Sequence, residues 1–201
     1  MVKRFFKLAA AVAVLGTVVC SCSSKGDFTE NEKEIILGAR DTILKVYKID
    51  NEEDLKVLRD TSAYLGVKAV ESGLYTTLAK RMVETVTHPQ VDGVGLAAPQ
   101  IGINRRVVAV QRFDKEGEPF EVYPNISIIE TSEELAPGKE GCLSVPNQRH
   151  EVMRHTWVTI QYYSLDAHKV VQERIEGFTA VIFQHEVDHL GGVLYIDRVQ
   201  Q

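Results

Sequence analysis

A five-residue segment near the C-terminus, His185-Glu186-Val187-Asp188-His189, constrains the fold and chemistry of this chain more than any other feature. It lies within residues 178–190, where apolar side chains and both histidines recur at helical spacing. Residues four apart on a helix lie one turn apart on the same face, so the two imidazoles can bind one metal ion while the glutamate activates a water molecule. The alternative is that the segment arises by chance and its histidines are hydrogen-bonded in a core.

A catalytic metal site of this kind needs a third ligand from the protein. Residues 191–201 contain Asp197 and no histidine, so a downstream ligand is poorly supported. Upstream, Cys142 lies in the segment Glu140-Gly141-Cys142-Leu143-Ser144. Its thiolate, together with two imidazoles, would leave one tetrahedral position open for water. The alternative for Cys142 is a packed core cysteine.

The segment Gly93-Val94-Gly95-Leu96-Ala97-Ala98-Pro99-Gln100 matches the weak dinucleotide pattern G-x-G-x-x-A. We reject a nucleotide site, because the segment follows a predicted helix rather than a strand and Pro99 blocks the helix that should start there. We interpret it instead as a segment whose glycines, having no side chain, let another backbone approach closely. Gln100 would then donate a hydrogen bond into the site, unless it is a loop residue exposed to water.

In order and spacing, these three segments resemble the three motifs of peptide deformylases, and the resemblance extends over residues 43–198. It implies a metal-dependent amidase that removes the formyl group from N-formylmethionyl peptides and releases formate. The ion it implies is Fe2+, with Zn2+ or Ni2+ able to occupy the same site, and the sequence itself does not choose between them. The implied metal ligands are Cys142, His185 and His189.

The roles of the neighbouring residues follow from charge and from the resemblance. A dipositive ion that binds one thiolate keeps a net charge of about +1, so it acidifies water weakly and a nearby base becomes valuable. Glu186 would be that base, taking a proton from water and returning it to the departing amine. By resemblance, the Gln100 side chain and the Leu143 backbone N–H would stabilise the oxyanion.

By resemblance, the substrate peptide would lie extended and pair with the backbone around Val94, Gly95 and Gly141. The methionine side chain would enter an apolar pocket drawn from the late helix, with Arg149 near its mouth. The pocket wall would include Val181 and Ile182, whose apolar character core packing explains equally well.

The remaining sequence pattern predicts an α+β fold. An apolar stripe at helical period, with Ser72 as candidate N-cap and His88-Pro89 as its end, predicts a helix built on Leu74, Leu78, Met82 and Val86. β-branched and aromatic residues predict strands over 106–113, 120–123, 157–163 and 169–175, with 165–168 as a hairpin turn. We therefore expect mostly antiparallel sheets packed around the C-terminal helix.

A basic start and an apolar run over residues 8–19 predict an export signal, and that run is too short to span a bilayer. Val19-Cys20-Ser21-Cys22 resembles a bacterial lipobox, in which the cysteine after the cut carries lipid. We predict a lipoprotein signal peptide over residues 1–21, a polar tether over 22–31 and a catalytic domain over 32–201. The protein would then lie at the cell envelope, anchored to a membrane through Cys22. The alternatives are a simple secretory signal, an uncleaved anchor, or a cytoplasmic protein whose signal is not used.

The charge balance excludes nucleic acid as a partner. The 201 residues include 23 Lys+Arg and 28 Asp+Glu, and three of the positive charges lie in the predicted signal. Nucleic-acid binding needs clustered Lys and Arg.

With Cys20 removed and Cys22 acylated, Cys142 would be the free thiol of the folded body. We expect the protein to be a monomer.

An export signal sets this chain apart from deformylases that act on nascent chains in the cytosol, so the expected substrates are shed or imported formyl peptides or another small N-acyl amine. Residues 26–71 are also longer than the resemblance needs, with a charged insert at residues 51–60. Two other functions remain open: an exported metallopeptidase or amidase acting on other N-acyl peptides, and a formyl-peptide binding protein without turnover. The intact Glu186 argues against the binding protein, since a binder needs no base.

Overall fold

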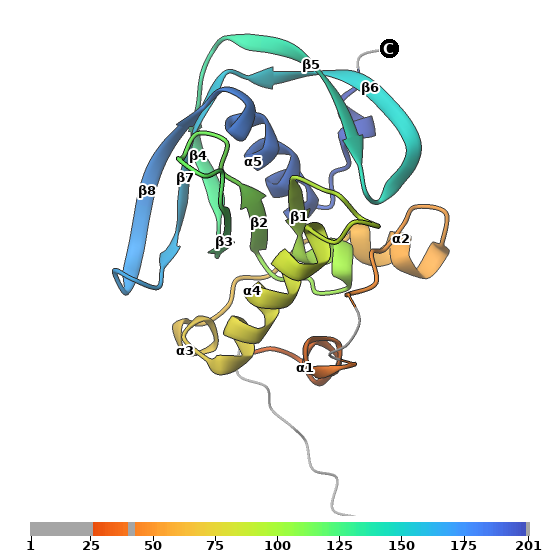
Figure 1. Cartoon of the computed structure of the whole chain (residues 1–201), viewed down its shortest axis with the longest axis vertical. Coiled ribbons are helices and arrows are strands. Elements are labelled where there is room, and N and C mark those ends of the chain that lie inside the picture. Colours follow the sequence, from red (N-terminus) through yellow and green to blue (C-terminus); the bar gives the residue numbers. More distant parts are fainter. Residues whose placement is uncertain (1–25, 40–42, 200–201) are drawn as a thin grey trace, which may run out of the picture.

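The late helix α5, Gly177–Leu190, contacts strands of three different β-sheets (Figure 1). The computed structural model describes residues 26–39 and 43–199, so the predicted signal peptide and Cys22 lie outside the described residues. In the described part, four helices come first along the chain, the strands follow, and α5 precedes a final 3-10 helix η2, Tyr195–Arg198. The predicted α+β class is confirmed, and α5 carries both histidines of the C-terminal segment.

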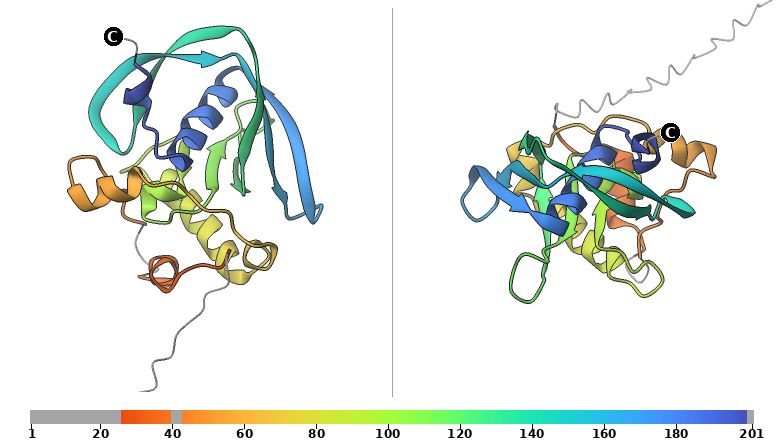
Figure 2. Two further views of the ribbon diagram at one scale, coloured as in Figure 1. Left: turned by 180° about the vertical axis from the view of Figure 1, so that it is seen from behind. Right: turned by 90° about the horizontal axis from the view of Figure 1, so that it is seen from above.

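The named strands pair antiparallel in every sheet. The first sheet has the order β1-β2-β3, with strands Gly95–Ala97, Val107–Gln111 and Phe120–Pro124. The second sheet has the order β4-β7-β8, with strands Ser127–Thr131, Trp157–Ser164 and Lys169–Glu176. The third is a two-stranded ribbon that arches over α5 in both views of Figure 2, formed by β5, Leu135–Cys142, and β6, Val145–His155.

The four predicted strand segments correspond to β2, β3, β7 and β8, and residues 165–168 form the turn between β7 and β8. The sequence pattern does not predict β1, β4, β5 or β6. In β5 the residues Pro137, Gly138 and Gly141 have poor strand propensity. Most β5 side chains are also exposed, so no alternation of apolar and polar residues marks the strand.

Helix α4, Gly73–Val86, forms where the apolar stripe predicts it and ends before His88-Pro89. Ser72 Oγ accepts a hydrogen bond from the Tyr75 backbone N–H at 3.2 Å, which satisfies a free donor of the first turn. The inward face of α4 packs in a core cluster with α1 and the first sheet, and its fully buried hydrophobic residues are Tyr75, Leu78, Met82 and Val86.

The folded part of the chain begins earlier than the predicted tether over residues 22–31 allows. Phe28 is buried, and Thr29 caps helix α1, Glu30–Leu37, in a reciprocal capping box with Glu32. The tether prediction is therefore wrong for residues 26–31. The polar composition of that segment concealed one buried aromatic side chain and a helix cap.

The charged segment at residues 51–60 contains a helix that is hydrogen-bonded to residues 45–48. This helix is α2, Glu52–Leu58, and its Asp54 is buried. The next helix along the chain is the short α3, Val67–Val70. Asp54 accepts hydrogen bonds from the Lys48 backbone N–H at 3.2 Å and from Lys45 Nζ at 2.7 Å. This carboxylate therefore fixes the course of residues 45–48.

Residues 47–49 in turn hold two of the sequence motifs together. The Tyr47 backbone N–H donates to the Gln100 carbonyl at 2.7 Å, and the Ile49 N–H donates to the Ser144 carbonyl at 3.0 Å. Gln100 follows β1 and Ser144 follows β5. One extended segment thus positions the glycine-rich motif relative to the cysteine motif.

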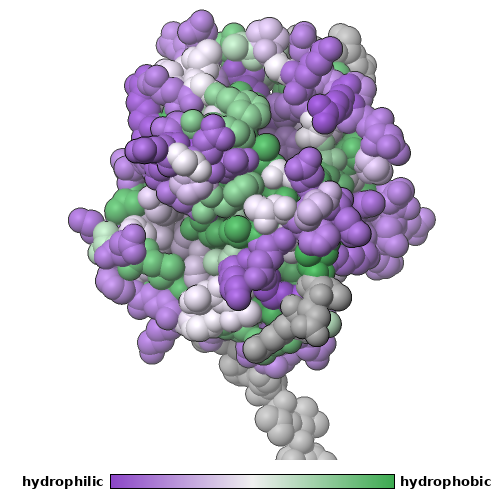
Figure 3. Space-filling model, viewed as in Figure 1, coloured by the Kyte–Doolittle hydropathy of each residue, from purple (hydrophilic) through white to green (hydrophobic). Residues whose placement is uncertain are grey.

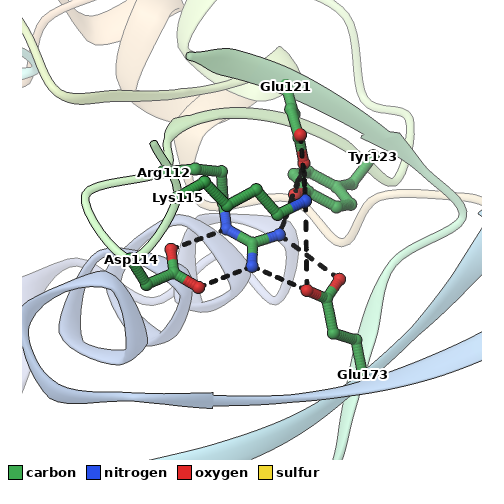
Figure 4. Close-up of polar contacts among 6 residues, drawn as sticks. All are labelled: Arg112, Asp114, Lys115, Glu121, Tyr123 and Glu173. Atoms are coloured by element: carbon green, nitrogen blue, oxygen red, sulfur yellow. Dashed lines mark hydrogen bonds and ion pairs between the residues drawn. The ribbon is translucent and has the colours of Figure 1, made fainter. Parts of the chain in front are cut away.

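A buried arginine joins the first sheet to the second (Figure 4). Arg112, directly after β2, donates from its guanidinium to the carboxylates of Asp114 and Glu173, each at 2.6 Å. It also donates to the Tyr123 hydroxyl of β3 at 2.6 Å. The hydrogen bond from Arg112 lowers the pKa of Asp114 to about 2, so this carboxylate is charged near neutral pH. The buried positive charge is therefore compensated on two sides.

Candidate metal centre and substrate cleft

Helix α5 presents His185 and His189 toward β5 and places Glu186 against Gly95 of β1. Its His185 is partly buried, whereas Glu186 and His189 are buried. The rings of His185 and His189 have a centroid separation of 5.2 Å, as expected for residues one helical turn apart.

Cys142 meets this helix from the end of β5. The register of β5 and β6 shifts between Glu140 and Cys142, so the strand is locally irregular where the cysteine turns toward α5. Cys142 Sγ lies 3.3 Å from His189 Nε2. The ligand atoms of Cys142, His185 and His189 all lie within 4.8 Å of one another. The predicted ligand set is therefore brought together, and Cys142 is no isolated core cysteine.

The chemistry of this donor set fits one divalent cation. His185 Nδ1 is 2.8 Å from Glu140 Oε2, which leaves Nε2 of the same ring for a metal, as is usual for histidine ligands. Burial lowers the pKa of His189, so its ring is neutral and has a lone pair to donate. One sulfur and two nitrogens leave a tetrahedral ion one further position, which a catalytic site requires.

His185 contacts a buried ion-pair network formed by Glu140, Arg154 and Asp188. Arg154 of β6 donates to Glu140 at 2.7 and 2.9 Å and to Asp188 of α5 at 2.6 Å. Burial alone would raise the pKa of Glu140, but hydrogen bonds from Arg154 and His185 lower it to about 2. Glu140 is therefore an anion at neutral pH. The sequence reasoning gave no role to these three residues, although a carboxylate partner for a ligating histidine is a general expectation.

The Glu186 side chain is buried and lies against Gly95 of β1. In the described residues its Oε2 has no hydrogen-bond partner, and burial raises its pKa to about 7. A Cβ atom built on Gly95 would overlap the Glu186 carboxylate. Gly95 is therefore required because the carboxylate occupies the space that any other side chain would need.

Gln100 is a buried residue of the site and not an exposed loop residue. It lies in the 3-10 helix η1, Ala98–Ile101, and is 1% exposed. Its Oε1 accepts the Ala97 N–H at 2.8 Å, which orients Nε2 toward Ser144 Oγ at 3.1 Å and Cys142 Sγ at 3.5 Å. The sequence reasoning missed Ser144, which is fully buried and contributes a second polar contact to Gln100.

A cleft of about 960 Å³ opens in front of these residues. Figure 3 shows hydrophobic side chains gathered in the middle of this face, between the β5–β6 ribbon and α4. Phe178 lines the cleft although it is 57% exposed, and its ring contacts that of Phe113 at a centroid distance of 5.2 Å. All the residues predicted to bind substrate line the cleft: Val94, Gly95, Gly141, Arg149, Val181 and Ile182.

The residues predicted to contact the substrate or the oxyanion differ in how deeply they are buried. Arg149 is exposed, and its side chain lies over Gly141, where an added Cβ would sit 3.3 Å from Arg149 Cγ. Ile182 is 4% exposed and also packs in a core cluster, so both interpretations of this residue apply. Val181 is half-buried. Leu143 lines the cleft and packs against the first core cluster.

A family model described as polypeptide deformylase matches residues 43–201. The chain belongs to the peptide deformylase family. The match begins before α2, so it includes the segment at residues 51–60 that the sequence analysis treated as an insert. Deformylases are metal-dependent, and in the described residues the group that could bind the ion is Cys142, His185 and His189.

Similar proteins agree with this family. The chain is 40% identical to a peptide deformylase of Caulobacter vibrioides over 161 residues, which are 79% of this chain and 89% of that protein. It is 44% identical to a peptide deformylase of Synechocystis over 124 residues, which are 61% of this chain and 64% of that protein. A solved Met-Ala-Ser complex of the class I type b peptide deformylase from Acinetobacter baumannii has a TM-score of 0.69 and 36% identity, covering 79% of this chain and 99% of that chain.

In this deformylase site, Gly95→Ala should lower kcat by about 100-fold or more, because the new methyl group displaces the Glu186 carboxylate. Metal content should stay at the wild-type level, since the three ligand side chains are untouched. Turnover of a formyl peptide and metal analysis on the same samples measure both quantities. Gly73→Ala is the matched control, because nothing lies within 4 Å of the added Cβ there. A Gly95→Ala protein with wild-type kcat would contradict the role assigned to this contact.

Proposed function

We propose that this chain hydrolyses the formyl amide of N-formylmethionyl peptides and releases formate. The observation that carries the proposal is the position of Glu186, which lies buried beside the Cys142–His185–His189 group and lines the same cleft. The Met-Ala-Ser peptide in the similar Acinetobacter baumannii structure supports a methionyl peptide as the ligand.

The proposed metal is one Fe2+ ion, and Zn2+ or Ni2+ would fit the same donors. A thiolate with two imidazoles suits each of these ions, and family membership favours the metal-dependent chemistry. When bound, the ion supplies a water molecule of lowered pKa and polarises the formyl carbonyl. Cys142, His185 and His189 would hold it, and Glu140 would orient His185.

Glu186 is the proposed proton carrier. Its Oε2 has no hydrogen-bond partner in the described residues, so this oxygen is not already engaged by another protein group. It would accept a proton from the attacking water and deliver it to the amine that leaves. Gly95 keeps the space in front of the carboxylate clear of side-chain atoms.

Gln100 and Leu143 are the proposed oxyanion donors. The Ala97 N–H fixes the Gln100 amide, so Nε2 is oriented before the substrate arrives. The Leu143 backbone directly follows Cys142, which places its N–H next to a metal ligand in the chain. Loss of one such donor typically costs about 3 to 4 kcal/mol of transition-state stabilisation.

The proposed mode of substrate binding is addition of an extended peptide to the edge of the first sheet. β1 pairs with β2 on one side only, which leaves its other edge for a peptide backbone near Val94 and Gly95. Gly141 lies across the cleft, and the methionine side chain would contact Val181, Ile182 and Phe178. Main-chain pairing would provide affinity and the apolar pocket specificity.

The direct test is formate release from formyl-Met-Ala-Ser by anaerobically prepared, Fe2+-loaded protein. Glu186→Gln should fold and retain its metal but lose turnover by about 1,000-fold, because it removes the proton carrier without changing side-chain size. Glu151→Gln, at an exposed position on β6, is the control and should keep wild-type turnover. Cleavage of unformylated Met-Ala-Ser would favour a metallopeptidase, and stoichiometric peptide binding without formate would favour a binding protein.

We also propose that the mature protein is a monomer anchored at the cell envelope through lipid on Cys22. The basic start, the apolar run over residues 8–19 and the Val19-Cys20-Ser21-Cys22 segment support this location. No helix within residues 26–39 and 43–199 is long and apolar enough to cross a membrane.

A fatty-acid probe supplied to growing cells should label the wild-type protein and leave Cys22→Ser unlabelled. The reason is that the thioether to lipid needs the Cys22 sulfur, whereas Cys20 would be removed with the signal peptide. Cys20→Ser is the control and should remain labelled. Label retained on the Cys22→Ser protein would contradict the predicted cleavage site.

A further inference from the structure

We propose that one end of the molecule, formed by α1, α3 and the β7–β8 turn, lies on the membrane surface with Tyr64 and Val67 at the lipid–water interface. This inference rests on the proposed anchor at Cys22. It adds which face of the enzyme meets the bilayer and, as a consequence, which way the cleft opens. Four groups of observations carry it.

The first observation is how close the anchor lies to the folded chain. The Gly66 backbone N–H donates to the Gly26 carbonyl at 2.8 Å, and Phe28 is buried two residues later. Only residues 23–25 separate Cys22 from Gly26. Four fully extended residue steps span at most about 14 Å. The surface around Gly26 and Gly66 must therefore lie within that distance of the lipid attachment point.

The second observation is the distribution of exposed apolar side chains. In the described part of the chain, nine large apolar residues are exposed, and five lie on segments of this end: Leu37, Tyr64, Val67, Leu165 and Val170. Two of the remaining four, Val94 and Phe178, line the cleft. Tyr64 and Val67 are 57% and 50% exposed and flank Gly66, which contacts Gly26. Two exposed apolar side chains therefore lie beside the point from which the anchor extends, and the other three lie on neighbouring segments of the same end.

The third observation is that these segments form one continuous end of the molecule. Glu71, just after α3, accepts hydrogen bonds from the Tyr163 hydroxyl at 2.7 Å and from His168 Nδ1 at 2.8 Å, which ties the β7–β8 turn to α3. Figure 1 shows α1 and α3 at the lower end and this turn above α3 at the lower left, and the view from behind in Figure 2 agrees.

The fourth observation concerns charge and the tyrosine itself. The Arg106 guanidinium lies over the Tyr64 ring at 5.1 Å from its centroid, so the ring is supported on one side while it remains exposed. Lys33 pairs with Glu30 on α1, and Glu71 pairs with His168. The charges at this end are mixed, which favours an uncharged bilayer interface over anionic lipid. Tyrosine is a residue type that membrane interfaces prefer.

The orientation leaves the active site accessible from water. In Figure 1 the β5–β6 ribbon and the start of α5 lie at the opposite end of the long axis from α1 and α3. The cleft is lined by residues of β5, β6 and α5. Soluble formyl peptides in the envelope would therefore reach the cleft without crossing the lipid surface.

Tryptophan quenching tests the proposed face on the full-length, processed protein. The chain has a single tryptophan, Trp157, so Trp157→Phe gives a silent background. Into it we would place Tyr64→Trp, or Leu135→Trp as a control of similar exposure on the ribbon at the other end. Each protein, labelled with a fatty-acid probe, would be reconstituted into phosphatidylcholine vesicles with brominated acyl chains. Formate release equal to wild type shows that each variant is folded.

The Tyr64→Trp protein should lose about half of its emission in brominated vesicles relative to unbrominated ones, because an interfacial residue sits within about 5–10 Å of the acyl boundary. The Leu135→Trp protein should lose almost none. Equal, weak quenching of both variants in lipid-labelled protein would overturn the proposed face and leave the anchor intact. Absence of fatty-acid label from every variant would instead overturn the anchor and, with it, this inference. Neither result would bear on the deformylase activity, which the formate measurement reads separately.

Discussion

The contact between the β5–β6 ribbon and α5 is the interaction on which the rest of the site depends. Glu140 of β5 lies between His185 and Arg154, and Arg154 also binds Asp188 of α5, so buried charges join ribbon to helix. Removing one partner of a buried ion pair typically costs about 3 to 5 kcal/mol, because the other charge is left uncompensated. That penalty keeps Cys142 beside the two histidines, which come from a segment more than 40 residues away in the chain.

The space beside the Cys142–His185–His189 group is limited by close packing between Gly95 and Glu186. Gly95 lacks the side chain that would displace Glu186, and the same glycine lies on an edge strand that a peptide backbone can approach. In the proposed mechanism, recognition of the substrate and placement of the proton carrier would both depend on this one residue. Gln100 is fixed by the Ala97 N–H and by the segment at residues 47–49, so its amide needs little reorganisation during a reaction.

The sequence predicted those parts of the structure that local periodicity marks strongly. α4 and α5 follow apolar stripes at helical spacing, and β2, β3, β7 and β8 follow β-branched and aromatic runs. The spacing of His185 and His189 and the lone Cys142 predicted a set of side chains that the structure does bring together, because ligand chemistry restricts residue type and spacing. β5 and β6 were not predicted, since β5 contains Pro137, Gly138 and Gly141 and runs of exposed residues in both strands hide the alternation of apolar and polar side chains. Phe28 and Thr29 were assigned to a tether, because a single buried ring within a polar segment leaves no periodic signal. Glu140 acts through its contact with His185 of α5, and Ser144 acts through its contact with Gln100 of η1. Both contacts join segments far apart in the chain, so these roles could not be derived from local pattern.

The measurement that tests this account most directly is the X-ray absorption spectrum of the full-length protein loaded with one equivalent of Zn2+. The account predicts a first shell with one sulfur at about 2.3 Å and two imidazole nitrogens at about 2.0–2.1 Å. Cys142→Ser should remove the sulfur contribution while the two nitrogens remain. A spectrum with no sulfur in the wild-type protein, or an unchanged sulfur contribution in Cys142→Ser, would contradict the assignment of Cys142, His185 and His189 as the metal group.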